Sequence, residues 1–599
     1  MKNWIYKLFA ASAAIVLIFG CEPNIDVPAP SSGGADFSNY IAVGNSLTAG
    51  YADGGLYDDA QMQSYPAIIA GQINKISPIS FTQPDIPGNG SGYIFLSSLA
   101  PDLGIALPDG DWLNQLEGPF NNLGVPGIRV KDISVAGYGS TQNANAYFYR
   151  MLGGKDANST YLSVVAESAP TFFTCWMGNN DVLGYASSGG AFGIGGLPGT
   201  GLNGLTDKAE FASLYTSLIN AFGSNARGVV VTLPDITLAP FFTQVPWNGA
   251  VLDADTAAIA NASYAARIDP QVEALVQEGI IELTVTETAL SANVVPTVAQ
   301  GAVYQQAYDQ AYQQAIDGGA TPDQAKAIAD DAATDFVASA EGQATIGALE
   351  GQLNAELQNH LLGQHDGHTE LEPLYAVMDQ ELATNTELQA GIAQGITDLT
   401  TAYEAGALPP EQQAALEGAI SQQTAAQIAQ LKAAGFYPVF QEGPNAFVIQ
   451  EESPGNPLGI RQMVEGEYIL LSAQLDGKLE GTAALEPKED QYILTLAEVA
   501  NIREYTDAYN QIIREKASEN IGLVEIGDVL TEVNNGIFQD GVSVNGDFIT
   551  GGAFSLDGVH LTPRGYAIAA NAIIEEINGK FNARITPAII NNHRAVVLP

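Results

Sequence analysis

The sequence predicts an α/β fold in which helices flank a parallel β-sheet. Apolar runs at Tyr40–Val43, Phe172–Met177 and Gly228–Pro234 end at glycine, asparagine or proline, which is typical of buried strands. An amphipathic helical pattern at Asp207–Phe222 separates two of these runs, and Thr562-Pro563 begins a closing helix. Strands that alternate with helices favour a parallel sheet covered on both faces, because every parallel connection must cross a face.

The N-terminus has the form of an export signal. Lys2 and Lys7 precede an apolar stretch at Phe9–Phe19 that is too short for a usual membrane span, and Cys21 follows it. A small residue before a cysteine at this point resembles the lipobox of bacterial lipoproteins, which implies cleavage before Cys21 and lipid attachment to its thiol. The alternative is a simple export signal with an incidental cysteine.

From this resemblance we expect a protein anchored by lipid in the bacterial cell envelope, at the outer membrane or its periplasmic face. Residues 1–21 are then a lipoprotein signal peptide ending at Cys21, and residues 22–36 are a flexible linker rich in proline, serine and glycine. Lipid chains tether a protein to a membrane without a spanning segment.

Charge and cysteine content exclude some partners and bonds. The chain of 599 residues has 67 acidic and 22 basic residues, a formal net charge of −45, so it repels nucleic acid, and no nucleic-acid partner is expected. With only two cysteines, lipidation of Cys21 would leave Cys175 without a disulfide partner. Cys175 lies within an apolar run and is expected to be a buried core residue, not a nucleophile.

The composition along the chain predicts an interrupted domain. Residues 37–246 and 500–580 carry the α/β pattern. Residues 247–435 are rich in alanine and glutamine and read as a helical insertion, in which Thr321-Pro322 and Pro409-Pro410 each begin a helix. Residues 436–499 read as a small β-rich segment, 581–599 as a C-terminal tail, and Pro78–Glu117 as a long irregular loop.

The insertion contains three histidines that raise the question of a metal site. His360, His365 and His368 lie near Asp366 and Glu370. Their spacing does not place two histidines on one helical turn, and neighbouring glycines indicate a loop. Surface polar residues are therefore the preferred interpretation, with a metal site as the alternative, and we expect neither a metal nor a cofactor.

Polar residues at strand ends and in loops form a candidate catalytic set. Ser46 follows the first apolar run, Gly127 lies in a turn, and Asn180 follows the run that contains Cys175. A serine hydroxyl needs a base to become a nucleophile, and His560 is a candidate base that Asp557, three residues earlier, can orient. The backbone N–H groups of Ser46 and Gly127 and the amide of Asn180 could bind an acyl oxyanion.

Four motifs that hold these residues, GNSLTAG, NLGVPG, GNND and DGVHLT, resemble in order the four blocks of the SGNH (GDSL) hydrolases. The resemblance covers about residues 37–245 and 500–580. It implies a flavodoxin-like, three-layer α/β/α domain that hydrolyses esters. It also implies that Ser46, Asp557 and His560 are catalytic and that Ser46, Gly127 and Asn180 form the oxyanion hole. One departure is that Asn45 stands where the family's block has aspartate.

The resemblance leads to the expectation of a serine esterase, lipase or acylhydrolase that cleaves carboxylic esters through an acyl-enzyme on Ser46. The expected partners are an ester substrate, either a lipid or an acylated glycan, and the membrane that holds the lipid anchor. The alternative is a non-catalytic binding or scaffolding lipoprotein of the cell envelope on an SGNH fold, which the large insertion would suit.

Overall fold

The computed structural model describes residues 29–98, 103–141, 144–190, 204–364 and 369–597. The chain divides into two compact units. The first, called the α/β unit, runs to Val251, resumes over Gly443–Glu452 and continues from Gln462 onward; the second, called the helical unit, comprises Leu252–Glu442 and Ser453–Arg461. The expected signal peptide with Cys21, and residues 22–28 of the expected linker, lie outside the described residues.

A five-stranded parallel sheet forms the centre of the α/β unit, as the sequence predicts. In sheet order its strands are β13 (Ile521–Val524), β6 (Arg227–Val231), β5 (Phe172–Trp176), β1 (Tyr40–Gly44) and β4 (Asn122–Gly124). Counted along the chain, this order is 2-1-3-4-5. Gly44 at the end of β1 lies opposite both Gly124 and Trp176, so three strands end at the same level.

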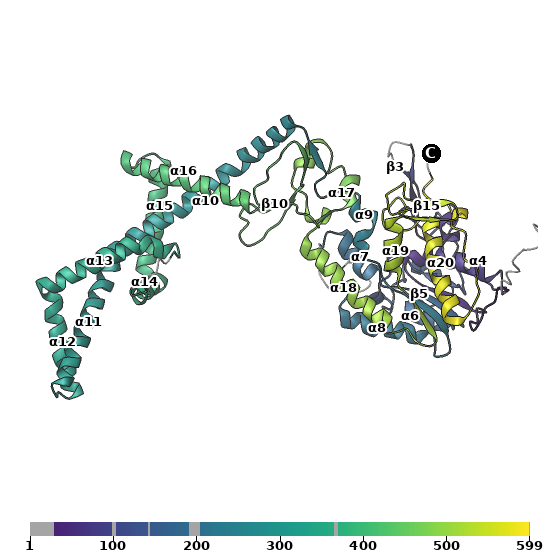
Figure 1. Cartoon of the computed structure of the whole chain (residues 1–599), viewed down its shortest axis with the longest axis horizontal. Helices are drawn as coiled ribbons and strands as arrows, with labels where there is room; N and C mark the ends of the chain where they lie inside the picture. The colour runs from purple at the N-terminus through teal and green to yellow at the C-terminus, as the bar shows by residue number, and fades with distance from the viewer. Residues whose placement is uncertain (1–28, 99–102, 142–143, 191–203, 365–368, 598–599) are drawn as a thin grey trace, which may run out of the picture. The chain divides into compact units, whose positions relative to one another are not determined.

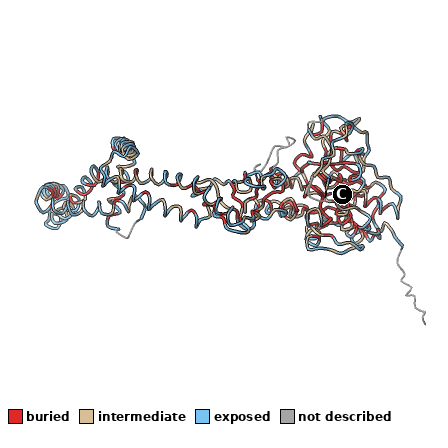
Figure 2. Tube along the Cα trace, turned by 90° about the horizontal axis from the view of Figure 1, so that it is seen from above, coloured by how far each residue is buried: buried red, intermediate tan, exposed pale blue. Residues whose placement is uncertain are grey.

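Helices cover both faces of this sheet (Figure 1). Phe172 and Phe173 are neighbours on β5, so their side chains point to opposite faces. The Phe172 ring packs on Phe581 of α20 (Pro563–Phe581) at 5.4 Å, whereas the Phe173 ring stacks on Phe222, at the end of α8 (Lys208–Ala221), at 3.9 Å. α20 and α8 therefore lie on opposite sides of the sheet, and both phenylalanines of β5 are buried in the main core. Figure 2 shows the buried residues of the chain in red.

The predicted ends of these two helices are confirmed. Asp207 caps α8 by accepting bonds from the backbone N–H groups of Ala209 and Glu210. Thr562 caps α20 by accepting a bond from the Gly565 N–H at 3.1 Å, and a proline occupies the first helical position. Such caps satisfy N–H groups that the helix itself leaves without an acceptor.

The remaining helices of the α/β unit are mostly short. They are α2 (Ser46–Ala49), α3 (Asp58–Met62), α4 (Tyr65–Ile73), α5 (Ala146–Met151), α6 (Tyr161–Ser168), α7 (Asn180–Ser187), α9 (Pro240–Thr243), α17 (Leu471–Leu475), α18 (Leu496–Arg514) and α19 (Ile526–Asn535). α4 packs against α20, while α6 and α18 pack against α8. The 3-10 turns are η1 (Val130–Asp132), η2 (Ile236–Leu238), η3 (Gly481–Leu485), η4 (Asp490–Tyr492) and η5 (Ile590–Asn592).

One expectation for this unit is wrong. The segment Pro78–Glu117, predicted to be an irregular loop, contains an antiparallel pair, β2 (Tyr93–Leu96) and β3 (Leu103–Ala106). Their apolar runs are only four residues long and lie among glycines and prolines, so they carry little periodic signal. The C-terminal residues also have structure, because η5 lies there and Arg594 forms an ion pair with Asp59.

Short strands flank the long helices of the insertion and precede the last helix. They are β7 (Ala250–Leu252), β8 (Gly443–Asn445), β9 (Val448–Gln450), β10 (Ile460–Gln462), β11 (Tyr468–Ile469), β12 (Ile493–Leu494), β14 (Ile537–Gln539) and β15 (Val542–Val544). β11 pairs with β12 and β14 with β15, in both cases antiparallel. A small separate core of the α/β unit gathers around Phe447, Ile449 and Ile493. The expected β-rich segment thus has short strands but also helix α17.

The helical unit consists of long helices with a thin core. They are α10 (Ala254–Asn293), α11 (Val295–Asp317), α12 (Pro322–Ala338), α13 (Ala340–Leu361), α14 (Glu372–Thr384), α15 (Thr386–Glu404) and α16 (Pro410–Ala433). The helix starts at Thr321 and Pro410 are confirmed, the first with a reciprocal capping box between Thr321 and Gln324. None of the described helices of the chain has the combination of length and apolarity that a membrane crossing needs.

Candidate active site

Ser46 lies at the sharp turn between strand β1 and helix α2. The side chain of Asn45 caps α2 by accepting a bond from the Leu47 N–H at 3.2 Å. Gly44 cannot be replaced here, since a Cβ would come within 2.0 Å of Thr48 Oγ1 and 2.5 Å of the Trp176 carbonyl oxygen. The local sequence therefore holds Ser46 at the end of a central strand. Only 6 % of the surface of Ser46 is exposed to solvent.

His560 reaches this serine from the loop before α20. Its Nε2 lies 2.8 Å from Ser46 Oγ, across 514 residues of sequence. The Tyr51 ring packs against the imidazole with 4.6 Å between centroids, and the Tyr51 hydroxyl is held by the Gly54 carbonyl oxygen at 2.6 Å. The imidazole of His560 thus packs against Tyr51 and hydrogen-bonds Ser46 through Nε2.

Asp557 completes a continuous hydrogen-bonded chain. Its Oδ2 lies 2.8 Å from His560 Nδ1, and its Oδ1 accepts the backbone N–H groups of Val559 and His560 at 2.9 and 2.8 Å. The carboxylate also accepts bonds from the Gly54 N–H and the Ser555 hydroxyl. Desolvation works against ionisation of this group, but His560 and the backbone donors outweigh it and hold the pKa of Asp557 well below its usual value.

The ionised Asp557 decides which nitrogen of His560 carries the proton. A carboxylate only accepts hydrogen bonds, so Nδ1 must donate to it. In the neutral imidazole Nε2 is then an acceptor that faces the hydroxyl of Ser46. This tautomer is the one a base needs in order to remove the proton of the serine.

Asn180 and Gly127 lie around a common segment near the serine. Asn180 is the first residue of α7, and its Nδ2 donates to the Ile128 carbonyl oxygen at 2.9 Å. A primary amide has two N–H bonds, so one can still donate elsewhere. Gly127 precedes Ile128 and has φ of +82°, a conformation that favours glycine.

The competing glycine in the same motif is engaged. The Gly124 N–H donates to Asn122 Oδ1 at 2.9 Å, which occupies its one donor. The φ of Gly127, and its place one residue from the segment that Asn180 binds, support Gly127 over Gly124 as an oxyanion donor. Ser46, Asn180 and His560 line one pocket. Gly127 does not line it, but it precedes Ile128, whose carbonyl oxygen Asn180 bonds.

The pocket has the position that the sheet topology indicates. In the order 2-1-3-4-5, the connections turn in opposite directions from β1 and β5, which are neighbours at the centre of the sheet. Open α/β sheets bind ligands beyond the carboxyl ends of the strands at such a switch point. Ser46 follows β1 and Asn180 follows β5 by a few residues, so the candidate site lies there.

Two buried carboxyl groups that organise this site, those of Asp53 and Asp181, were not predicted from the sequence. The Asp53 carboxylate accepts hydrogen bonds from the Leu556 N–H and the Tyr57 hydroxyl. The backbone N–H of Asp53 donates to Ser555 Oγ. Asp53 thus links the loop after α2 to the loop that carries Asp557. Burial raises the pKa of Asp53. The residues it joins are about 500 positions apart, and no spacing in the sequence reveals such a link.

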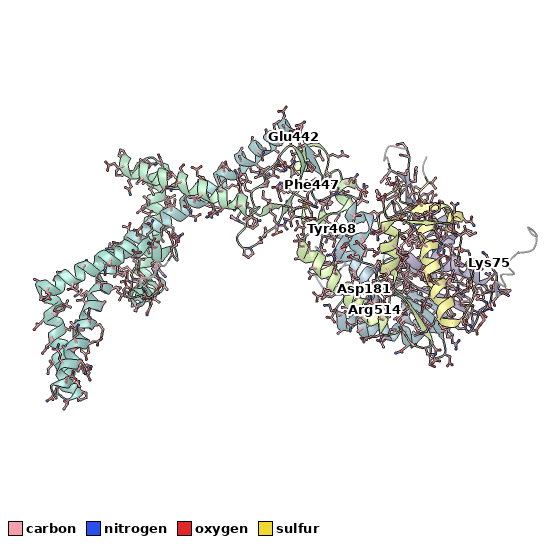
Figure 3. All side chains as sticks on the ribbon, viewed as in Figure 1. Lys75, Asp181, Glu442, Phe447, Tyr468 and Arg514 are labelled. Carbon is pink, nitrogen blue, oxygen red and sulfur yellow. The ribbon has the colours of Figure 1, made fainter. Side chains whose placement is uncertain are left out.

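The second missed carboxyl group is Asp181, which lies inside the α/β unit (Figure 3). Its Oδ2 accepts the Val130 N–H at 2.8 Å and its Oδ1 accepts the Thr206 hydroxyl. Burial raises the pKa of Asp181 to about 7. Asp181 and Asn180 thus bind the same segment at Val130 and Ile128, and a signal was present, since both residues stand in the GNND motif.

The other candidate residues take structural positions. Cys175 is buried on β5, as expected, and burial raises the pKa of its thiol to about 12. His360 of the helical unit stacks on Tyr375 and bonds Asp379 Oδ1 through Nε2 at 2.8 Å. His365, Asp366 and His368 lie outside the described residues. Within the described part of the chain, no group of three or more histidine, cysteine, aspartate or glutamate side chains could hold a metal ion.

Comparison of the chain with protein-family models, with curated proteins and with solved structures finds no match in any of the three. The site itself consists of a serine hydroxyl, an imidazole and a carboxylate in one hydrogen-bonded line, and Asn180 lines the same pocket as the serine. Chemically, such a line can transfer the serine proton to the imidazole while the carboxylate stabilises the resulting charge.

Proposed function

We propose that this protein is a serine esterase or acylhydrolase of the SGNH (GDSL) hydrolase type. The single observation that carries the proposal is the hydrogen-bonded line of Ser46, His560 and Asp557. The distance is 2.8 Å from Ser46 Oγ to His560 Nε2 and 2.8 Å from His560 Nδ1 to Asp557 Oδ2. The strand order 2-1-3-4-5 is that of flavodoxin-like sheets and supports a three-layer α/β/α hydrolase domain.

In the proposed reaction Ser46 Oγ attacks the ester carbonyl while His560 Nε2 takes its proton. Asp557 stabilises the imidazolium, and the N–H groups of Ser46 and Gly127 with the Asn180 amide bind the negative oxygen of the tetrahedral intermediate. His560 then donates the proton to the leaving alcohol. Water, activated by His560, attacks the acyl-enzyme in the same way, and the acid is released with the serine restored.

The proposal extends to where the enzyme works. An N-terminal lipid on Cys21 would keep the catalytic domain at an envelope membrane, with a lipid or an acylated glycan as the ester substrate. The mechanism needs only side chains and backbone groups of the chain, and no cofactor is proposed. The high acidic excess, −45, argues against nucleic acid as a partner.

The decisive test is the Ser46→Ala variant, assayed with p-nitrophenyl esters against the parent protein. We expect a loss of kcat of at least about a thousandfold, because no other hydroxyl is bonded to His560 Nε2 in the described structure. A fluorophosphonate probe should label Ser46 in the parent protein only. Folded parent protein that neither turns over esters nor reacts with the probe would favour the alternative, a binding or scaffolding lipoprotein on this fold.

A further inference from the structure

The chain enters the α/β unit at the edge of the sheet opposite the candidate site. The Gly34 N–H donates to the carbonyl oxygen of Phe581, the last residue of α20, at 2.7 Å. Arg227, the first residue of β6, donates to the Gly34 carbonyl oxygen. β1 follows, and its carboxyl end leads to Ser46. The entering segment therefore lies at the amino ends of the strands, whereas Ser46 lies at their carboxyl ends.

Further hydrogen bonds fix the start of the described chain to this edge. The backbone N–H of Arg584 donates to the Ser31 carbonyl oxygen at 2.8 Å, and Arg584 Nε donates to the Ala29 carbonyl oxygen at 2.7 Å. Gly33 packs so closely here that a Cβ would come within 2.4 Å of the Phe581 carbonyl oxygen. From Ala29 onward, the expected linker is thus bound to the α/β unit and adds nothing to the reach of a tether.

Only a short segment then joins the α/β unit to the expected lipid. Seven residues, 22–28, separate Cys21 from Ala29. A fully extended chain covers about 3.5 Å per residue, so the path from Cys21 to Ala29 spans at most about 28 Å. A lipid on Cys21 would therefore hold the bound edge of the α/β unit within that distance of the membrane surface.

The candidate site is about as far from the bound edge as this tether is long. α20 begins just after the loop of His560 and ends at Phe581, where the entering segment is bound. A helix rises 1.5 Å per residue, so the 19 residues of α20 separate its two ends by about 28 Å. To bring Ser46 to the membrane, the tether would have to extend fully along this whole length. An orientation with the bound edge toward the membrane needs no such extension and retains more chain entropy.

We propose that the lipid anchor holds the α/β unit with the amino ends of its strands toward the membrane, so that the candidate site faces away from the bilayer that carries the anchor. Of the two ester classes open to the proposed enzyme, this orientation favours an acylated glycan on the aqueous side over a lipid of the same bilayer. The inference rests on the proposed esterase function and on lipidation of Cys21.

The orientation is tested with the full-length protein, lipidated in a bacterial host and reconstituted in phospholipid vesicles. Lys580→Cys places a thiol at the end of α20 beside the bound segment, and Asp528→Cys places one in the first turn of α19, after the carboxyl end of β13. Both positions are exposed and Cys175 is buried, so a fluorophore labels only the introduced thiol.

A quencher on the lipid headgroups reports which label is near the membrane. We expect the label at position 580 to lose most of its emission and the label at position 528 to keep it. Equal quenching of the two labels, or stronger quenching at position 528, would overturn the orientation.

The substrate class is tested with acetyl esters that differ in where they lie. Acetylated xylan and a free aryl acetate are dissolved in water, and the same aryl acetate is also linked to a phospholipid headgroup in the vesicles that carry the protein. We expect the vesicle-bound protein to cleave acetylated xylan as fast as the unlipidated Cys21→Ser variant does. We expect it to cleave the headgroup-linked ester at least about tenfold more slowly than the free aryl acetate, because the tether does not span the required distance. Equal rates for the two aryl acetates, or no turnover of acetylated xylan, would overturn the substrate assignment.

A longer tether is the matched variant. An insertion of about 20 glycine and serine residues after Pro28 adds about 25 Å of average span, which lets the site turn toward the bilayer. We expect it to raise the rate with the headgroup-linked ester at least about tenfold and to leave the rate with acetylated xylan unchanged. An unchanged rate with the headgroup-linked ester would show that tether length does not keep the site from the membrane and would overturn the inference.

Failure of this inference can be separated from failure of the esterase proposal. If the free aryl acetate is cleaved and Ser46 reacts with a fluorophosphonate, a contrary result overturns only the orientation and the substrate class. If neither reaction occurs in folded protein, the esterase proposal falls and the substrate assignment with it. Full-length protein that does not stay on vesicles would overturn the lipid anchor and the orientation together.

Discussion

The two units of the chain hold together in different ways. In the α/β unit, hydrogen bonds join residues that are hundreds of positions apart, such as Ser46 to His560 and Asp53 to Leu556. In the helical unit, many bonds are local, such as the capping box of Thr321 and Gln324, although Asn261 bonds the backbone of Phe440. Its core is a thin stripe of side chains around Leu353 and Leu357. The candidate site thus lies where the structure depends on distant segments, and we expect the two units to respond differently to substitution.

The largest effect is expected from Asp557→Asn in the α/β unit. The amide would favour the wrong tautomer of His560, and comparable changes in serine hydrolases lower kcat by roughly 10⁴-fold. The measurement is the steady-state rate with p-nitrophenyl butyrate, with the thermal midpoint as a check on folding. Glu504→Gln, on the exposed side of α18, is the control and should keep the parent rate. A decrease of less than tenfold in Asp557→Asn would show that the carboxylate does not orient the histidine.

The second effect concerns the dependence of stability on pH. Asp181 has an ordinary pKa of 3.8 when unfolded and about 7 when folded, so between these values the folded state binds more protons. The free energy of unfolding should therefore fall as the pH rises from about 4 to about 7, by as much as about 4 kcal/mol from this group. Asp557, with a lowered pKa, contributes in the opposite sense: its stabilisation is present above about pH 4 and is lost in acid.

The variant Asp181→Asn should remove the contribution of Asp181 to this slope, because the amide does not titrate. Urea unfolding of parent and variant at several pH values from 4 to 8 measures the difference. A variant with the same slope as the parent would show that Asp181 is not protonated in the folded state at pH 5. Since Asp181 holds Val130 next to the segment of Gly127, we also expect kcat to fall by about tenfold with little change in KM.

A pair of helix caps gives a smaller and more direct comparison of the units. Thr562 bonds the Gly565 N–H and the Gly552 carbonyl oxygen and is buried, whereas Thr321 bonds the Gln324 N–H and is exposed. We expect Thr562→Ala to cost about 2 kcal/mol of unfolding free energy and Thr321→Ala about 1 kcal/mol or less. Denaturant unfolding followed by circular dichroism measures both, and equal costs would contradict the proposed difference between buried and exposed caps.

The smallest effect is expected from removing the helical unit. The residues that flank it in the α/β unit lie together, since Asn445 Nδ2 donates to the Ala250 carbonyl oxygen at 3.4 Å. Replacing residues 254–441 with a short glycine-serine linker should leave kcat for p-nitrophenyl butyrate within about threefold, because every hydrogen bond of the catalytic line lies within the α/β unit. A folded deletion protein without activity would show that the helical unit takes part in catalysis.

Much of the α/β unit could be predicted because its signals are local. The apolar runs that form β1, β5 and β6 are continuous, as buried parallel strands are, and the capped starts of α8 and α20 can be recognised from single residues. The hairpin β2–β3 could not be predicted, because its short runs are interrupted by turn-forming residues. The helix α17 was also missed, since the apolar run at Tyr468–Leu471 favours a strand and only its first two residues form one.

The candidate site was predictable to the extent that its residues stand in recognisable motifs. Ser46, Asp557 and His560 were expected together, and the structure brings their side chains into hydrogen-bond contact. The supporting roles of Asp53 and Asp181 were not expected, because each depends on which distant backbone N–H groups the fold presents to it. The sequence therefore indicated the central residues of the candidate site. It did not indicate the hydrogen-bond network that surrounds them.

The distance along the chain between Ser46 and His560 has a consequence for synthesis. A ribosome makes Ser46, the proposed nucleophile, early and His560, its proposed base, more than 500 residues later. Arg594 is later still, and it bonds the Tyr57 hydroxyl, which in turn holds Asp53. A nascent or truncated chain therefore carries the serine without the groups proposed to activate it. The proposed hydrolase activity would then arise only after His560 and Arg594 are made, and fragments that lack them would be inactive.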